Sequence, residues 1–329
     1  ESMKASRTVA ALLVAIAASG PVAAADRAAG ASVYPVKPIR ILVPTPPGGG
    51  NDIMARMAAQ KMNERWNHPV VVDNRPGAGG QIAMETSARA APDGYTLLLG
   101  TTNLTVLPSM TKVAYDPVRD FVPVSLMATS ANLLLVHPGV DAKSLQQLLA
   151  LARAKPGQLN YASGSIASST QLAAELMKSM ARVDITHVPY KGAGPALVDL
   201  LAGQVQIMFS NPAASAAHVR SGKLRALAAT SEKRLPDFPE LPTMAESGLP
   251  GYEASTWWGI LAPRGTPAGI VKDLNEVISN ATTAGDVRSR IAALGAQPAG
   301  GPPQQLANLI RDEIPKWSRV IKEAGIRLE

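Results

Sequence analysis

The sequence predicts an α/β protein of two lobes, with a mainly parallel sheet in each lobe and two chain segments that cross between them. Short apolar runs alternate with helix-compatible segments along most of the 329 residues, as in parallel sheets whose faces are covered by helices. Two extended runs, 121–136 and 253–262, flank one block of this alternation. Such crossings enclose a cleft, with hinges expected near Thr129 and Trp257. The expected lobes are 26–128 with 258–329, and 129–257.

Each strand is expected at an apolar run that ends in glycine, proline, asparagine or serine, because these residues interrupt strand pairing and begin turns. The expected strands lie near Ile39, Val70, 95–99, 121–126, 132–136, Leu159, 185–188, 204–209 and 224–229. Helices are expected between them, including 53–63, 144–154, 170–180 and 195–202. Ligands of such sheets bind at the carboxyl ends of the strands.

Three of the expected strands run directly into a loop rich in glycine or serine and then into a helix. The loops are 44–50, 74–80 and 163–169. Unpaired amides and the positive end of the dipole make a helix N-terminus attractive to an anion. Asn51 or Asp52 is expected to cap the first of these helices. Several such loops in one chain predict a cleft that binds a carboxylate or a phosphate.

The N-terminal segment has the pattern of a secretory signal peptide. Lys4 and Arg7 precede a short apolar run, and the segment ends in the small residues 23–25. This run is much shorter than the roughly 20 residues that span a bilayer. We therefore expect residues 1–25 to be removed by cleavage after Ala25, with Glu1 and Ser2 as a cloning remnant, and the mature chain to be exported to the periplasm.

Composition narrows the functional class. The formal net charge is +7, and it falls to +6 when Glu1, Lys4 and Arg7 are removed with the signal peptide. The basic residues are scattered and do not alternate with aromatic ones, which argues against nucleic acid as a partner. Without cysteines the chain has neither disulfides nor thiolate chemistry. A monomer without stable membrane insertion is expected.

Enzymatic alternatives find weaker support. A serine hydrolase using loop 163–169 is the main one, but the chain has no Gly-x-Ser-x-Gly elbow and its four histidines are far apart in sequence. A nucleotide-binding enzyme is a further alternative. Residues 77–82 approximate a dinucleotide fingerprint, yet Ile82 replaces the last glycine. No metal-ligand spacing occurs either. No catalytic residue, metal site or cofactor is predicted.

Five segments together resemble the substrate receptors of tripartite tricarboxylate transporters, the Bug family. They are 41–56, 74–80, 190–192, 221–228 and 257–263. The resemblance extends over essentially the whole chain after Ala25. It implies a two-lobed periplasmic binding protein of type II, the Venus-flytrap kind, that performs no chemistry. Such a receptor delivers a small organic acid, a di- or tricarboxylate or an aromatic carboxylate, to a membrane permease.

The resemblance also implies a set of ligand-binding residues. They are Thr45, Pro47, Gly48, Gly49, Asp52, Thr101 and Thr102 in the first lobe, and Ser168, Ser169, Thr170, Tyr190, Lys191 and Asn211 in the second. The residue types alone favour structural roles for three of them: Asp52 as a helix cap, Lys191 as a surface or packing lysine and Tyr190 as a core residue. Of Trp257 and Trp258, alternation places one in the core and leaves the other to line the cleft.

The chain departs from the family pattern in the second lobe. Receptors of this family often have a glycine-x-glycine turn where this chain has residues 165–167, a histidine at the position of Gln171, and an acidic residue at that of Ser210. The ligand therefore does not follow from the resemblance. Replacing Ser169 with alanine is expected to weaken binding, and leucine at Gly49 is expected to obstruct the cleft and strain the backbone.

Overall fold

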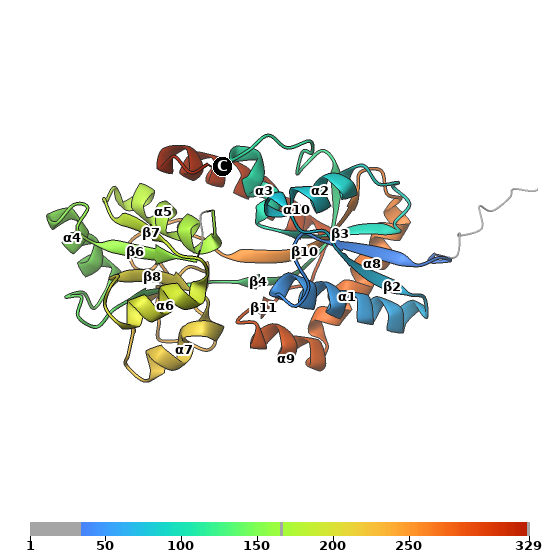
Figure 1. The fold of residues 1–329 in the computed structure, drawn as a ribbon. Helices are drawn as coiled ribbons and strands as arrows, with labels where there is room; N and C mark the ends of the chain where they lie inside the picture. The colour runs from blue at the N-terminus through green and yellow to red at the C-terminus, as the bar shows by residue number, and fades with distance from the viewer. Residues whose placement is uncertain (1–33, 165–166, 328–329) are drawn as a thin grey trace, which may run out of the picture. The chain divides into compact units, whose positions relative to one another are not determined.

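Two β-sheets organise the chain in the computed structural model, which describes residues 34–164 and 167–327. The predicted signal peptide, residues 1–25, lies outside the described residues. Residues 35–329 form one unit, and within it each sheet has its own layer of helices on either face (Figure 1). The first sheet has six strands in the order β11-β4-β10-β3-β1-β2, and the second has five in the order β7-β6-β8-β5-β9.

The first sheet is assembled from both ends of the sequence. Its strands are β1 Ile39–Val43, β2 Val70–Asn74, β3 Thr96–Thr101, β4 Phe121–Ser130, β10 Thr256–Pro263 and β11 Gln297–Pro298. Its helices are α1 Gly50–Trp66, α2 Gln81–Ala88, α3 Asn103–Val106, α8 Ala268–Thr283, α9 Gly285–Ala293 and α10 Pro303–Ala324. Short 3-10 turns occupy Ala78–Gly80 and Leu107–Ser109.

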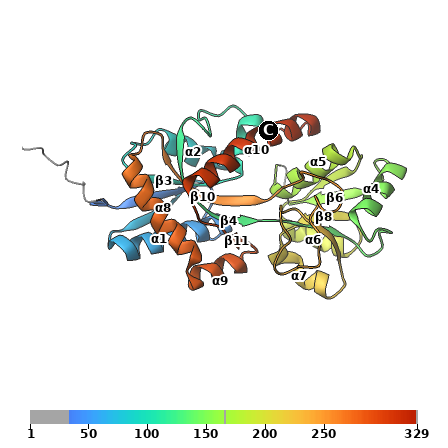
Figure 2. The same cartoon turned by 180° about the vertical axis from the view of Figure 1, so that it is seen from behind.

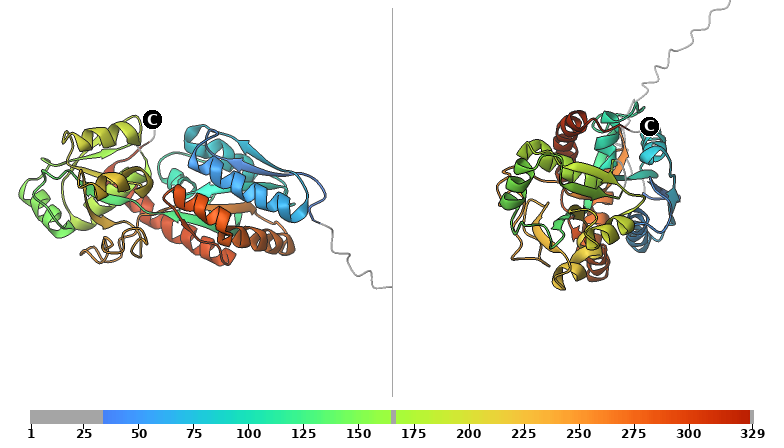
Figure 3. Two further views of the ribbon diagram at one scale, coloured as in Figure 1. Left: turned by 90° about the horizontal axis from the view of Figure 1, so that it is seen from below. Right: turned by 60° about the vertical axis from the view of Figure 1, so that its left-hand side comes forward.

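The second sheet comes from the middle of the sequence. Its strands are β5 Leu133–Val136, β6 Asn160–Ser163, β7 Thr186–Pro189, β8 Ile207–Ser210 and β9 Arg225–Ala229. Its helices are α4 Leu145–Ala154, α5 Ser169–Ala181, α6 Ala193–Leu201 and α7 Pro212–Arg220. Viewed from below, the two sheets with their helices stand as separate bodies side by side (Figure 3).

The sheets are mixed, with more antiparallel pairing than the sequence predicted. Strand β1 is parallel to β2 and β3, whereas β10 is antiparallel to β3 and β4. In the second sheet β6 is parallel to β7 and β8, and β5 is antiparallel to β8 and β9. The reason lies in the crossings. The chain leaves the first sheet along β4 and returns along β10, so these neighbours run in opposite directions.

The two crossing strands are hydrogen-bonded to each other along their length. Trp257 pairs with Thr129, and Thr256 pairs with Ser130, so the two expected hinge positions are direct partners. The extended run 121–136 is broken after Ser130, where β4 ends, and resumes at Leu133 as β5 of the second sheet. The expected boundaries of the lobes stay a prediction, although both crossings lie where the extended runs indicated.

Helix α10 is a third connection between the two sheets. Near its start, Leu306 and Ile310 pack in a hydrophobic cluster with residues of the first sheet such as Leu98. Further along, Trp317, Val320 and Ile321 belong to the cluster around the second sheet, and the helix packs against both β4 and α5. From behind, α10 runs along the back of β10 and ends beside α5 (Figure 2). The C-terminal segment therefore contacts both halves.

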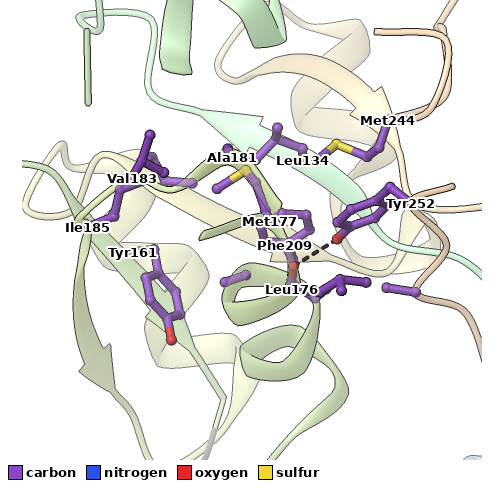
Figure 4. Close-up of a cluster of buried hydrophobic side chains, with 14 of the residues drawn as sticks. Leu134, Tyr161, Leu176, Met177, Ala181, Val183, Ile185, Phe209, Met244 and Tyr252 are labelled. Carbon is purple, nitrogen blue, oxygen red and sulfur yellow. Dashed lines mark hydrogen bonds between the residues drawn. The ribbon is translucent and has the colours of Figure 1, made fainter. Parts of the chain in front are cut away.

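The core of the second half is built from large side chains on α5 and on the strands of the sheet. Met177 from α5 packs beside Phe209 of β8, and both are fully buried (Figure 4). The hydroxyl of Tyr252 donates to the carbonyl of Ala173 at 2.7 Å, which fixes the chain just before it returns to the first sheet. Burying side chains of this size stabilises the fold by about 1.5–3 kcal/mol each.

Candidate ligand-binding cavity

A cavity of about 490 Å³ lies between the two sheets, at the carboxyl ends of β3 and β8. Its polar wall consists entirely of uncharged residues, namely Asn51, Thr101, Thr102, Asn103, Asn132, Ser169, Thr170, Ser210, Asn211 and Thr256. Its apolar wall is formed by Leu172, Ala193, Met208, Ala214, Trp257, Trp258 and Leu294. Among the described residues, no charged side chain lines this cavity. A ligand there is held by neutral donors and apolar contact.

Several helices begin at this cavity. Its lining includes Gly50 at the start of α1, Ser169 at the start of α5 and Ala193 at the start of α6. It also includes Asn211, the N-cap of α7. Each helix N-terminus presents unpaired amides and contributes about 0.3–1 kcal/mol of attraction to an anion. The cavity is therefore electrostatically suited to an anion even though its described lining includes neither lysine nor arginine.

Side-chain caps fix two of these helix starts. The Ser168 hydroxyl accepts from the amide of Gln171 at 3.3 Å, and the Asn211 side chain accepts from the amide of Ala213 at 2.7 Å. Asn211 also donates from its amide nitrogen to the Ser130 hydroxyl at 2.7 Å. Each cap accepts from one free amide of the first turn, and it therefore holds that turn in place.

The start of α1 is organised differently from the prediction. Its N-cap is Gly49, and neither Asn51 nor Asp52 caps it. The Asp52 carboxylate instead accepts from the Gly48 amide at 3.0 Å and from Arg56 at 2.9 Å. The bond from Arg56, assisted by the Gly48 amide, holds the pKa of Asp52 below its usual value against the opposing effect of burial. Asp52 therefore fixes the glycine loop, and it does not line the cavity.

Two buried polar side chains of the lining lack a hydrogen-bond partner within the described structure. They are the amide nitrogen of Asn132 and the hydroxyl of Thr102, on residues that are only 4 % and 6 % exposed. Asn132 precedes β5 of the second sheet, and Thr102 follows β3 of the first. A buried polar group without a partner costs about 1–3 kcal/mol. Both residues of the cavity wall therefore carry a buried polar atom whose desolvation is not compensated within the described structure.

Five of the predicted site residues line the cavity: Thr101, Thr102, Ser169, Thr170 and Asn211. The others lie outside its lining. Thr45, Pro47, Gly48 and Gly49 form the turn before α1, and Ser168 is the cap of α5. Tyr190 donates to Asp199 at 2.7 Å, and burial together with this bond raises the pKa of Tyr190 to about 12. Lys191 is exposed.

The predicted strain at Gly49 does not occur. This residue has an ordinary extended backbone, with φ of −85°, and nothing lies within 4 Å of the position that a β-carbon would take. It is Gly48, at φ of +88°, that needs the freedom of glycine. Leucine at position 49 therefore adopts an ordinary extended backbone, and its β-carbon has open space around it.

Sequence reasoning missed several lining residues, chiefly Asn51, Asn103, Asn132 and Thr256. A signal for Asn132 was present, because it is a polar residue at the interruption of a long apolar run. Trp257 and Trp258 both line the cavity, whereas alternation predicted only one of them. Both indoles have partners: Trp257 donates to Glu313 at 2.8 Å and Trp258 to Asn51 at 2.6 Å. These two bonds fix the orientations of both indole rings.

The structure brings one histidine next to the end of the strand that precedes α5, which the spacing of the four histidines along the chain did not predict. His187 lies 2.7 Å from the Ser163 hydroxyl through its Nε2 atom. Its Nδ1 atom faces the amide nitrogen of Gln171 at 3.3 Å, where a hydrolase would place an orienting carboxylate. Ser163 is fully buried and does not line the cavity. No cluster of metal-ligating side chains occurs among the described residues.

Replacing Ala167 with glycine is expected to stabilise the protein. Ala167 has φ of +63°, a left-handed conformation that costs a non-glycine residue about 1–2 kcal/mol. Part of this gain is offset by the greater freedom of glycine in the unfolded chain, so about 0.5–1 kcal/mol is expected. Thermal unfolding measures it, with Ala162→Gly on β6 as a control that must destabilise. An unchanged or lower melting temperature of Ala167→Gly would contradict the assignment of strain.

Comparison with known proteins agrees with this geometry. Residues 54–326 match the family model described as "Tripartite tricarboxylate transporter family receptor". Protein BugT of Bordetella pertussis is 41% identical over 302 residues, which cover 91% of this chain and 93% of BugT. A protein of the tcbD-tcbE intergenic region of Pseudomonas sp. (strain P51) is 42% identical, over 90% of this chain and 89% of that protein.

Solved structures give the same result. R. palustris Rpa4515 with adipate has a TM-score of 0.71 at 38% identity and covers 89% of this chain and 99% of its own. MatC from Rhodopseudomonas palustris with bound malate has a TM-score of 0.69 at 35% identity, over 88% and 100%. A TctC solute-binding protein from Polaromonas, described as having no ligand, reaches 0.81 at only 27% identity, over 88% and 99%.

Two sheets joined by paired crossing strands, with a cavity between them, define a two-lobed binding protein of type II, so the predicted fold class is confirmed. The chain belongs to the family of tripartite tricarboxylate transporter receptors, as the sequence resemblance indicated. This family consists of solute receptors. No helix in the described part of the chain is long and apolar enough to cross a membrane.

Proposed function

We propose that this protein is a periplasmic receptor that binds a small organic acid between its lobes and delivers it to the permease of a tripartite tricarboxylate transporter. One observation carries the proposal. Helix N-termini from both halves converge with neutral donors on one cavity, and none of the described residues that line it is charged. Family members solved with adipate and malate support a carboxylate as the ligand.

The strength of such a site is sufficient for a receptor. A hydrogen bond to a charged group contributes about 1.5–3 kcal/mol, and micromolar affinity corresponds to about 8 kcal/mol. Four to six donors therefore exceed the requirement, even after the costs of ordering and desolvation. Amides and hydroxyls on both sides of the cavity supply donors of this kind, so an arginine clamp is unnecessary.

The apolar wall narrows the choice of acid. Leu172, Met208, Trp257 and Trp258 face the same cavity as the donors, and apolar surface removed from water contributes about 25 cal/mol per Å². An acid with an aliphatic or aromatic body gains this contribution, whereas a tricarboxylate places a third charge against a wall without cations. We therefore expect dicarboxylates and aromatic carboxylates to bind more tightly than citrate.

Thermal-shift screening against organic acids tests the function, because a ligand of the native state raises the melting temperature by mass action. Adipate, malate, benzoate and citrate are suitable first probes, with the corresponding amides as uncharged controls. Stabilisation by the acids and not by their amides is expected. Stabilisation by nucleotides alone, or turnover of a p-nitrophenyl ester that is lost in Ser163→Ala, would contradict the receptor function and favour an enzyme.

Replacing Ser169 with alanine is expected to weaken binding of the best acid about tenfold. Ser169 is the first residue of α5 and lines the cavity, and one lost hydrogen bond to a charged group costs about 1.5 kcal/mol. Calorimetric titration measures the change. Ser289→Ala is the matched control, because Ser289 is an exposed residue of α9 that bonds to Gly285. Equal affinities of the two variants would place the carboxylate elsewhere.

A further inference from the structure

His187 contacts residues on both sides of the turn 167–170, where α5 begins. It lies on β7, and its Nε2 atom is 2.7 Å from the hydroxyl of Ser163, the last residue of β6. Its Nδ1 atom is 3.3 Å from the side-chain nitrogen of Gln171, in the first turn of α5. Its ring stacks on Tyr161, with the ring centres 4.7 Å apart. The imidazole thus connects the strand before the turn to the helix after it.

Gln171, which contacts His187, also forms hydrogen bonds to two residues of the turn. Its side-chain oxygen accepts from the Ala167 amide at 2.6 Å, and its backbone amide donates to the Ser168 hydroxyl at 3.3 Å. Ala167 has a left-handed backbone, which an alanine adopts only when its surroundings impose it. The hold of Gln171 on the Ala167 amide is such an imposition, and Ser168, Ser169 and Thr170 follow immediately.

These bonds allow His187 only one protonation state. Because the oxygen of Gln171 faces the Ala167 amide, its nitrogen must face Nδ1 of His187. Two donors cannot share a hydrogen bond, so Nδ1 accepts and the proton is on Nε2, which donates to the Ser163 hydroxyl. A second proton on Nδ1 would oppose the Gln171 amide. Turning that amide over would satisfy His187 but would leave the Ala167 amide without its acceptor.

The charged groups around His187 come from α5. The Glu175 carboxylate accepts from the Tyr161 hydroxyl at 2.6 Å and from Lys178 at 2.9 Å. Burial holds the pKa of His187 below its usual value of 6.5, the charge of Lys178 acts in the same direction, and that of Glu175 opposes both. Tyr161 is the other titratable neighbour, and burial raises its pKa. His187 is therefore neutral near pH 7.

We propose that neutral His187 is the positioning residue of the ligand-binding turn, so that its protonation in acid releases Gln171 and Ala167 and lowers the affinity for a carboxylate. This inference rests on the proposed function for its ligand. The direction follows from the bonds: affinity is complete while His187 is neutral and falls as the pH drops through the pKa of its imidazole. Because Ser163 and His187 do not line the cavity, the effect acts through the turn.

The decisive variant is Gln171→Glu. One carboxylate oxygen continues to accept from the Ala167 amide, and the other accepts from Nδ1–H, so the protonated imidazole is tolerated. The dissociation constant for adipate is measured by calorimetry from pH 7.5 to 5.0 in the wild type, in Gln171→Glu and in His68→Gln. The last variant is the control, because it removes a half-buried imidazole that does not line the cavity. Adipate itself is protonated as the pH falls, and this changes all three dissociation constants by the same factor. The ratio of two dissociation constants measured at one pH is therefore free of this effect.

The ratio of the wild-type constant to that of Gln171→Glu is expected to rise about tenfold as the pH falls, while the ratio to His68→Gln stays constant. Parallel profiles of the wild type and Gln171→Glu would overturn the proposal. NMR of ¹⁵N-labelled protein without ligand gives an independent test. The proton of neutral His187 should be on Nε2, and the Ala167 amide should shift with the titration of His187. A proton on Nδ1, or an unaffected Ala167 amide, would also overturn it.

The two measurements separate this inference from the function on which it rests. If neither adipate nor any other acid of the panel binds at pH 7.5, the proposed function fails. The NMR titration, which uses no ligand, then still decides whether His187 positions the turn.

Discussion

Replacing Asn132 with aspartate is expected to reduce carboxylate binding by about a thousandfold at pH 8. Asn132 belongs to the cavity lining and is buried, and its side-chain amide nitrogen has no partner among the described residues. Aspartate has the same shape but exchanges this donor for a negative charge. Two like charges about 4 Å apart repel by about 4 kcal/mol at an effective dielectric constant of 20, which is about three orders of magnitude in affinity.

The control for this prediction is Asn132→Ala, which removes the donor without adding charge. It should cost about tenfold, the value of one hydrogen bond to a charged group. Calorimetry at pH 8 on both folded variants distinguishes the two effects. Equal losses in the two variants would mean that the ligand's charge is not next to Asn132. Normal binding by the aspartate variant would mean that the ligand occupies another part of the cleft.

Replacing Trp317 with alanine is expected to lower the stability of the whole protein by about 3–5 kcal/mol, the usual cost of removing a buried tryptophan. Trp317 is 2 % exposed and lies on α10, where the helix packs against the cluster of the second sheet. For a chain of this size such a loss corresponds to a decrease of about 4–8 °C in melting temperature. Calorimetric unfolding measures it directly.

Trp66→Ala is the matched control, since Trp66 is the last residue of α1 and is only partly buried. It should lower the melting temperature much less. A second expectation concerns the shape of the transition. Helix α10 contacts both halves. Without the Trp317 side chain its hold on the cluster of the second sheet is weakened, so the single unfolding transition should separate into two. A single transition at the wild-type temperature would show that α10 does not couple the halves.

The order of the strands from β1 to β10 was predictable because each strand carries its own local pattern, whereas β11 and the helices after β10 were not predicted. The run Ile39–Val43 is apolar and stops at prolines and glycines, so β1 and the start of α1 follow from adjacent residues. The pairing of β10 with β4 could not be predicted in this way. It joins residues more than a hundred positions apart, and their relative direction depends on the course of the chain between them.

The candidate site was predictable to the extent that it consists of loops that follow strands. Thr101 ends β3, Thr102 follows it, and Ser169 and Thr170 open α5. The family resemblance implied all four, and their places after strands agree with it. Asn132, Thr256 and the second tryptophan lie on the crossing segments, where no loop motif marks them. Their place in the cavity depends on how β4 and β10 pass between the sheets, which is a property of the assembled fold.

The register of the crossing strands has a consequence for modularity. Because Thr256 pairs with Ser130, the segment 131–255 starts and finishes at adjacent points and has the topology of an insertion into the first sheet. In principle a short linker replaces it without displacing β4 from β10. Excised on its own, however, this insert would expose the apolar face that Trp317, Val320 and Ile321 of α10 cover. The C-terminal helix thus makes the inserted module dependent on its host.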